Sequence, residues 1–285
     1  MKLLFLFLFA ASTAFATGEY DLAGVWRLSG SDPKGVAIRT EARIPGDVHS
    51  ALLAAELMSD VFYGANETQT LWVARCPWTL SRTFELGEDF LGHSEIVLRL
   101  EDCDSFAKII INGHEVGHTT SRFQRYTFDV KPYLVQGTNT IKARFLSPVL
   151  AGDARARSLV RPYPMSNAPW AKNQALVRKP ACHAGWDWGP EIETIGLCGK
   201  VALIASDKPR IDYVYTQQEF NEDLTHCTLD VIAELSDSTA VTNRLEIDNP
   251  PLWWPNGAGE QRFYEYEVEV NGEKVKGRVG LRKLV

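Results

Sequence analysis

The sequence predicts an all-β protein of β-sandwich architecture, and three observations carry this prediction. Short apolar or alternating runs recur along the chain, and Gly, Asn or polar turns separate them, as β-strands require. Asn-Gly pairs, a strong hairpin signal, follow two of these runs, at 112–113 and 271–272. Helical patterns are rare, which favours sheets packed on sheets. The expected strands span 26–28, 78–86, 94–100, 106–111, 138–145 and 200–205.

One helix stands out among these strands. Asp47 is a good N-cap for a helix over 48–58, with apolar surface from Leu52, Leu53, Ala55, Leu57 and Met58. The stretch 147–180 has few regular signals and contains several prolines. Because long loops inside compact domains are usually functional, we expect this stretch to be a functional loop.

A domain boundary is expected near residues 205–210. The turn-rich run Ser206-Asp207-Lys208-Pro209 follows the strand at 200–205, and a second β unit begins at Ile211. We therefore assign residues 17–207 to a first domain and residues 208–285 to a second.

Composition excludes several classes of protein. Of the 285 residues, 45% are hydrophobic and 23% are charged, which is the balance of a folded domain rather than of a disordered or multi-span membrane chain. The net charge of −6 and the lack of a basic run argue against nucleic acid as a partner. No membrane partner is expected.

The N-terminus indicates the secretory pathway. Lys2 precedes an apolar run at 3–11 and the small-x-small ending Ala14-Phe15-Ala16, as in a signal peptide covering residues 1–16. The alternative is a first core strand or helix, but the Ala-x-Ala ending has no folding purpose. In this compartment Asn66-Glu67-Thr68 is an expected N-glycosylation site at Asn66.

Metal binding is not expected from the cysteines or histidines. The five cysteines fit no zinc spacing, and we expect scattered buried thiols with at most one disulfide. His114 and His118 are four residues apart, but they follow a hairpin turn, which predicts a strand with both rings in solvent. His49 and His226 have no evident partner in the sequence.

One cluster carries distinctive chemistry. In the run Gly185-Trp186-Asp187-Trp188-Gly189-Pro190 a carboxylate stands between two indoles. A carboxylate accepts hydrogen bonds from sugar hydroxyls, and indoles offer apolar faces and N–H donors, which is the chemistry of a sugar pocket. The alternative is that the indoles anchor a core and that Asp187 accepts from buried amides. Under either interpretation Arg178 is a candidate ion-pair partner for Asp187.

Several segments together resemble the β-mannosidases of glycoside hydrolase family 2. The Trp-Asp-Trp run resembles a signature near the end of the family's N-terminal domain, and it favours β-mannosidase over β-galactosidase or β-glucuronidase. Other segments agree in order and spacing. They lie at 44–50, 60–67, 78–84, 106–128, 251–261 and 280–285.

The resemblance implies a jelly-roll (galactose-binding-like) sandwich followed by an immunoglobulin-like sandwich, which we expect to be short and incomplete in these residues. It implies that Trp186, Asp187 and Trp188 bind a terminal β-mannose of a β-mannoside oligosaccharide, without a metal or organic cofactor. It also implies an exo-β-mannosidase that retains configuration and acts on glycoprotein oligosaccharides, in the lysosome in animals.

The two catalytic glutamates of this family lie on a (β/α) barrel, and we expect that barrel to be absent from these 285 residues. The chain by itself is then predicted to be inactive, as a truncated or alternatively spliced product or an incomplete gene model. The alternatives are a secreted carbohydrate-binding module without catalysis and a nonfunctional fragment.

Overall fold

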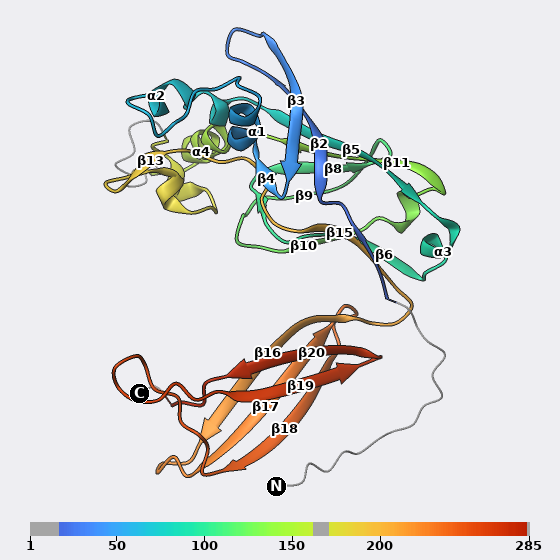
Figure 1. Ribbon diagram of the computed structural model, residues 1–285, viewed down its shortest axis with the longest axis vertical. Helices are drawn as coiled ribbons and strands as arrows, with labels where there is room; N and C mark the ends of the chain where they lie inside the picture. The colour runs from blue at the N-terminus through green and yellow to red at the C-terminus, as the bar shows by residue number, and fades with distance from the viewer. Residues whose placement is uncertain (1–16, 162–170, 284–285) are drawn as a thin grey trace. The chain divides into compact units, whose positions relative to one another are not determined.

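The computed structural model describes residues 17–161 and 171–283, and it separates them into two compact units (Figure 1). The larger unit comprises residues 17–205, and the smaller unit begins at Ser206. The division lies two residues before the boundary expected from the sequence. Residues 1–16, to which the sequence analysis assigns a signal peptide, lie outside the described residues.

The larger unit is a sandwich of two antiparallel sheets. One sheet has the strand order β3-β2-β5-β11-β8-β9, and the other has the order β1-β15-β6-β10. The strands of the first sheet are β3 (Ala37–Ile44), β2 (Gly24–Ser31), β5 (Trp78–Leu86), β11 (Gly137–Phe145), β8 (Ala107–Ile111) and β9 (His114–His118). Those of the second are β1 (Gly18–Asp21), β15 (Val201–Ser206), β6 (Glu95–Leu100) and β10 (Tyr126–Asp129). A third, short sheet joins β4 (Gly46–Asp47), β14 (Gly196–Leu197) and β7 (Cys103–Asp104).

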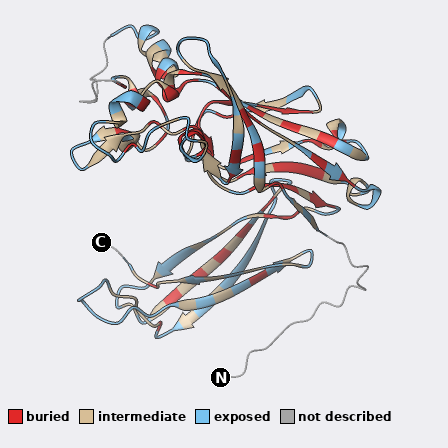
Figure 2. Ribbon diagram, turned by 45° about the horizontal axis from the view of Figure 1, so that its top comes forward, coloured by how far each residue is buried: buried red, intermediate tan, exposed pale blue. Residues whose placement is uncertain are grey.

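The core of the larger unit follows from the two-residue period of its strands. Side chains alternate between the interior and the outer face, so that buried and exposed residues alternate along β5 and β11 (Figure 2). Trp26 and Trp78 are fully buried, and their indole N–H groups donate to the carbonyl oxygens of Leu22 and Val73 at 2.8 and 2.9 Å. The indoles thus fill the interior without leaving a buried donor unpaired.

Both hairpins predicted from Asn-Gly pairs are confirmed. Asn112 and Gly113 have positive φ values of 48° and 90°, which are accessible to Asn and Gly, and they connect β8 to β9. Asn271 and Gly272, with φ values of 55° and 86°, connect β19 (Tyr264–Val270) to β20 (Glu273–Val279).

The predicted helix is present but shorter than expected. Helix α1 spans Val48–Ala54, and the Asp47 side chain caps it by accepting from the Ser50 N–H at 3.0 Å. The prediction that it continues to Met58 is wrong, because Glu56 adopts a left-handed conformation with φ of 56°. Leu53 within the helix and Leu57 beyond its end are both exposed, and Leu52 is the leucine that enters the core.

The stretch 147–180 contains a helix that the sequence analysis missed. Helix α4 (Pro148–Arg157) starts with Ser147, whose hydroxyl accepts from the Leu150 N–H at 3.0 Å. Pro148 occupies the first helical position, where a missing N–H costs nothing. The serine and proline that suggested a loop are therefore helix-start signals. Residues 162–170 of the same stretch lie outside the described residues.

The smaller unit is also built of antiparallel sheets. Strands β16 (Ile211–Phe220), β17 (His226–Leu235) and β18 (Ala240–Asp248) form one sheet, and β19 and β20 form the other. The core gathers residues from both sheets. Its buried members are Ile211, Cys227, Leu229, Val231, Ala233, Leu235, Val268 and Leu281. The described part of this unit thus has five strands, where an immunoglobulin-like sandwich has about seven.

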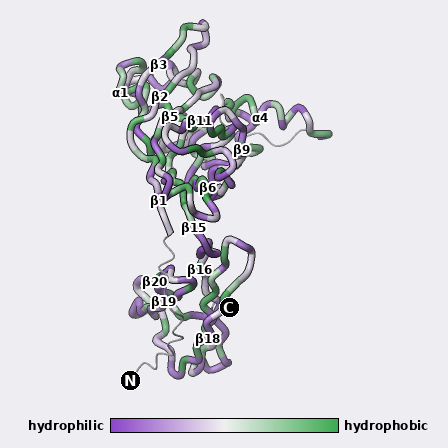
Figure 3. The backbone as a smooth tube through the Cα atoms, turned by 90° about the vertical axis from the view of Figure 1, so that its right-hand side faces the viewer, coloured by the Kyte–Doolittle hydropathy of each residue, from purple (hydrophilic) through white to green (hydrophobic). Residues whose placement is uncertain are grey.

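Hydrophobic and hydrophilic residues intermingle along the strands of both units (Figure 3). Among the described residues, no helix has the length and apolar character needed to cross a membrane.

Candidate functional site: an exposed Trp-Asp-Trp hairpin

The Trp-Asp-Trp run lies at the tip of a short hairpin. Strand β12 (Ala184–Trp186) pairs antiparallel with β13 (Gly189–Glu191), with Trp186 opposite Gly189. Asp187 and Trp188 therefore form the two-residue connection. Gly185 has a φ of 92°, a conformation that side-chain-bearing residues rarely adopt, so the hairpin depends on glycine at this position.

All three residues of the run face solvent. Trp186 is 57% exposed and Trp188 is 74% exposed, and Asp187 is exposed as well. The interpretation that the indoles anchor a core is therefore wrong. The candidate ion pair between Arg178 and Asp187 is not formed in the described part of the chain. Arg178 instead accepts a backbone hydrogen bond from the Arg122 N–H at 2.8 Å.

Beneath the hairpin lies a buried ionic cluster centred on Lys179. Its ammonium group lies 3.1 Å from Oδ1 of Asp104 and 3.0 Å from Oε2 of Glu193, and it donates to the Thr194 carbonyl oxygen at 2.6 Å. The side chains of Lys179 and Asp104 are fully buried, and that of Glu193 is 2% exposed. A buried charge needs such partners because desolvation otherwise disfavours it strongly.

Asp104 has a full set of donors within this cluster. Nη1 of Arg122 lies 3.1 Å from its Oδ2, and the hydroxyl of Thr194 donates to the same oxygen at 2.5 Å. The Ser105 hydroxyl donates to Oδ1. Two cations and two hydroxyls therefore satisfy a carboxylate that has no contact with water.

The cluster fixes both ends of the hairpin-bearing segment. Lys179 and His183 precede the hairpin, Glu193 and Thr194 follow it, and Asp104 belongs to β7 of the sandwich. Nδ1 of His183 lies 3.0 Å from the Thr194 hydroxyl, which joins the two flanks directly. The ionic cluster thus anchors the residues on both sides of the exposed hairpin tip.

Burial shifts the pKa values of several groups around this cluster. Desolvation lowers the pKa of His183 to about 4 and that of His49 to about 4, so both rings are neutral near pH 7. Desolvation, followed by the nearby charge of Glu193, raises the pKa of Glu191 to about 7. Burial also raises the pKa of Glu193, against the opposing effect of Lys179.

Asp104, Lys179 and Glu193 were not among the site residues predicted from the sequence. Asp104 is remote in sequence from the other two residues, and only the pairing of β14 with β7 and β4 brings that part of the chain alongside. Lys179, which belongs to the stretch 147–180, was the one residue that could have indicated the cluster from the sequence. A lysine beside buried apolar residues needs an acidic partner.

Asn66 immediately precedes helix α2 (Glu67–Thr70) and is partly exposed. Its side-chain amide donates to the Asp60 carbonyl oxygen at 2.9 Å. N-glycosylation at this residue stays a prediction.

The remaining candidate residues do not assemble into a metal site. All five cysteines are free, and Cys76, Cys103 and Cys227 are buried, which agrees with the expectation of scattered thiols with at most one disulfide. His114 and His118 lie on β9 and are exposed, which confirms their predicted placement. His226, for which the sequence shows no evident partner, has two in the structure: its ring nitrogens lie 2.8 and 2.9 Å from Asp248 and Glu246. Within the described ranges no group of three or more potential ligands is arranged to hold a metal ion.

Comparisons with known proteins match most of the chain. Residues 26–199 match the family model described as glycosyl hydrolase 2 galactose-binding domain-like. A beta-mannosidase from Bos taurus is 27% identical over 93% of this chain, and a probable beta-mannosidase from Caenorhabditis elegans is 25% identical over 92%. The crystal structure of a beta-D-mannosidase from Dictyoglomus thermophilum has a TM-score of 0.81 at 29% identity, over 93% of this chain.

The same alignments cover a much smaller share of the relatives. They span 34% of the Bos taurus protein, 33% of the Caenorhabditis elegans protein and 36% of the Dictyoglomus thermophilum chain. The chain therefore corresponds to about one third of the length of these relatives. Because the family model covers more than half of the chain, and the β-sandwich has the architecture that this model implies, the chain belongs to glycoside hydrolase family 2.

Proposed function

We propose that this chain is the substrate-contacting portion of a β-mannosidase and that Trp186, Asp187 and Trp188 bind the terminal, non-reducing β-mannose of an oligosaccharide. The observation that carries the proposal is the joint exposure of the two indoles beside an exposed carboxylate. Two large, neighbouring aromatic side chains that are exposed to water indicate a binding surface, and stacking on a sugar ring is a chemically suitable contact for them.

The roles of the three residues follow from their chemistry. An ionised Asp187 accepts hydrogen bonds from two sugar hydroxyls, and its charge strengthens them. The flanking indoles cover the apolar faces of the ring and shield those hydrogen bonds from water. The buried cluster at Lys179 holds the tip in place, which lowers the entropy lost on binding.

Hydrolysis requires more than this site supplies. Retaining glycosidases use two carboxyl groups about 5–5.5 Å apart, one as nucleophile and the other as acid and base. We assign neither role within these residues. We therefore expect the 285-residue chain to bind a β-mannoside without cleaving it, and we expect cleavage to depend on a catalytic barrel.

The proposal extends to cellular location. The signal-peptide pattern of residues 1–16 and the acceptor sequence at Asn66 support entry into the secretory pathway, and a glycoprotein-degrading β-mannosidase would then act in the lysosome. Release of the chain to the extracellular space is the alternative destination.

Two measurements test the proposal. Tryptophan fluorescence is titrated with mannobiose for the wild type, for Asp187→Asn and for a control, Glu222→Gln, which alters an exposed carboxylate of the smaller unit. We expect a saturable change for the wild type and the control, and a loss of roughly tenfold or more in affinity for Asp187→Asn, since a charged hydrogen-bond acceptor is removed.

The second measurement is hydrolysis of an aryl β-mannoside at acid pH. Absence of turnover together with mannobiose binding supports the proposal, and it equally fits a secreted binding module. Turnover by the purified chain contradicts the assignment of catalysis to another part of the protein. Failure of the wild type to bind mannobiose contradicts the role of the hairpin.

A further inference from the structure

A polar groove runs across the outer face of the six-stranded sheet of the larger unit. It has a cavity volume of about 1400 Å³, and strands β3, β2, β5 and β11 form its floor. Ligand pockets for small molecules occupy about 300–1000 Å³, so the groove has room for an occupant larger than one monosaccharide. None of the Trp-Asp-Trp residues lines it.

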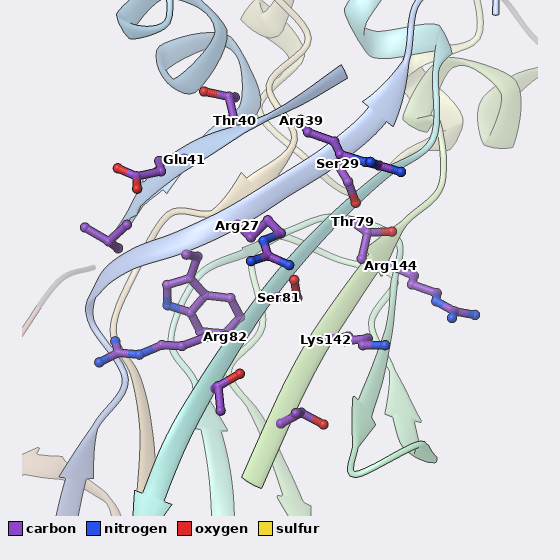
Figure 4. A pocket seen from close by; sticks show the side chains of 14 residues that line it. Arg27, Ser29, Arg39, Thr40, Glu41, Thr79, Ser81, Arg82, Lys142 and Arg144 are labelled. Atoms are coloured by element: carbon purple, nitrogen blue, oxygen red, sulfur yellow. The ribbon is translucent and has the colours of Figure 1, made fainter. Parts of the chain in front are cut away.

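Cationic side chains dominate the lining of this groove. Arg27, Arg39 and Arg144 are exposed and Lys142 is half-buried, while Glu41 is the single acidic residue among the lining side chains. Figure 4 shows Arg27, Lys142 and Arg144 around the hydroxyl side chains Ser81 and Thr79. A surface with this excess of positive charge is unexpected in a chain with a net charge of −6.

Strand register explains how the cations gather. Ser29 lies opposite Arg39 on one side and Thr79 on the other, and Thr79 in turn lies opposite Arg144. The neighbouring row contains Glu41, Arg27, Ser81 and Lys142. Two residues along a strand advance about 7 Å, so the two rows are about that far apart. The result is a floor of small hydroxyl groups with guanidinium and ammonium groups standing around it.

One acidic side chain of the lining, Glu41, lies opposite Arg27 in the strand register. No ion pair joins Arg27, Arg39, Lys142 or Arg144 to an acidic group in the described part of the chain. Arg82, which also lines the groove, is occupied differently, because it donates to the carbonyl oxygens of Leu22 and Ala23. Four positive charges are therefore available to a ligand, and mutual repulsion among them is relieved when an anion binds.

The lining distinguishes an anionic saccharide from a protein partner. Stable protein interfaces have apolar, often aromatic centres. Here Val25 is the exposed apolar side chain of the lining, and the indole of Trp26 is buried in the core. Guanidinium groups pair with sulfate or carboxylate oxygens in a bidentate manner, and serine and threonine hydroxyls hydrogen-bond sugar hydroxyls.

We propose that the groove formed by β3, β2, β5 and β11 binds an oligosaccharide that carries sulfate or carboxylate groups. This site goes beyond the proposed β-mannoside site and does not depend on it. Arg39 and Arg144 contact anionic groups at the two sides of the groove, and the central hydroxyls contact the sugar backbone.

Isothermal titration calorimetry of the 285-residue chain tests this proposal with four probes: a heparin octasaccharide, tetragalacturonate, neutral mannotetraose and a single-stranded oligonucleotide. We expect binding of at least one of the two acidic saccharides, weakening as salt is added, and no binding of mannotetraose. The double variant R39Q/R144Q should lose about tenfold or more in affinity, because two charge-assisted contacts are removed.

The matched control is R262Q/K276Q, which removes the same charge from exposed positions of the smaller unit. It should retain wild-type affinity. Absence of binding by both acidic saccharides overturns the proposal, as does equal loss in the control. Oligonucleotide binding as tight as saccharide binding also overturns it, because the groove would then be a general polyanion surface.

Discussion

The two units place similar ionic chemistry in opposite environments. In the larger unit Lys179 meets Asp104 and Glu193 where all three side chains are at most 2% exposed. In the smaller unit Arg244 makes two hydrogen bonds of 2.8 Å to Asp230, yet its side chain is 66% exposed. Water screens the second pair, whereas the first has no solvent to replace a missing partner. Burial, rather than bond geometry, decides which of these contacts the fold depends on.

The largest expected effect comes from removing the centre of the buried cluster. Lys179→Met should lower the free energy of unfolding of the larger unit by about 3–5 kcal/mol, because Asp104 and Glu193 lose a shared counter-charge. Urea unfolding followed by tryptophan fluorescence measures this change. The matched variant Arg244→Met should leave the free energy of unfolding unchanged within error. An equal loss in both variants would contradict the conclusion that burial decides how much an ionic contact contributes to stability.

A packing substitution should have the next largest effect. A Cβ at Gly30 would collide with the ring of Trp78, which is fully buried and tethered to the Val73 carbonyl oxygen. Gly30→Ala should therefore cost about 1–3 kcal/mol of unfolding free energy. Gly277→Ala in the smaller unit meets the hydroxyl end of Tyr266, and it should cost less because that ring is only partly buried, whereas Trp78 is fully buried. Thermal unfolding compares the two, and a larger loss at Gly277 would contradict this reasoning.

The stability of the two units should respond to pH in opposite directions, because the pKa of a histidine is lowered in the larger unit and raised in the smaller one. The pKa of His49 is lowered to about 4, so unfolding takes up a proton and the larger unit loses stability as pH falls from about 6.5 to 4. Hydrogen bonds to Asp248 and Glu246 raise the pKa of His226. Its contribution to the stability of the smaller unit is therefore complete at pH values below the unfolded-state pKa, and it is lost as the pH rises through the folded-state pKa. NMR titration of the ring protons should separate them, with His226→Gln as the assignment control. A His49 that titrates at or above 6.5 would refute the contrast.

The smallest effect is expected at the hairpin tip. Trp188 is 74% exposed, so Trp188→Ala should change the unfolding free energy by no more than about 0.5 kcal/mol. The same substitution should abolish any fluorescence response to mannobiose. Chemical denaturation of the variant checks the first expectation, and a loss of several kcal/mol would mean that the indole packs against the protein after all.

Much of the fold was predictable because strand alternation and turn chemistry are local. The Asn-Gly pairs specified both hairpins, and Trp78–Leu86 emerged as a single strand with the predicted bounds. The end of α1 was not predictable in this way, since a left-handed Glu56 breaks a pattern that remains apolar to Met58. Helix α4 was missed because Ser147 and Pro148 serve equally as loop residues and as helix-start residues.

The candidate site shows the same difference between features that are local in sequence and features that depend on tertiary structure. The Trp-Asp-Trp run was visible in the sequence because its three residues are consecutive, and the structure adds that they face solvent. The ionic cluster was not visible, because Asp104 and Lys179 meet only through tertiary structure. The cationic groove was hidden for a related reason, since its charges come from three different strands, β2, β3 and β11, and form no basic run in the sequence.

The position of β15 has a consequence for how the larger unit is made. This strand, the last of its unit, lies between β1 and β6, and its residues Ala202 to Ala205 pair with the first described residues of the chain. During synthesis the second sheet therefore stays split until the ribosome has released Val201–Ser206. Because this closure joins the two ends of the unit, a circularly permuted version that links them and opens the exposed β2–β3 connection should fold to the same sandwich.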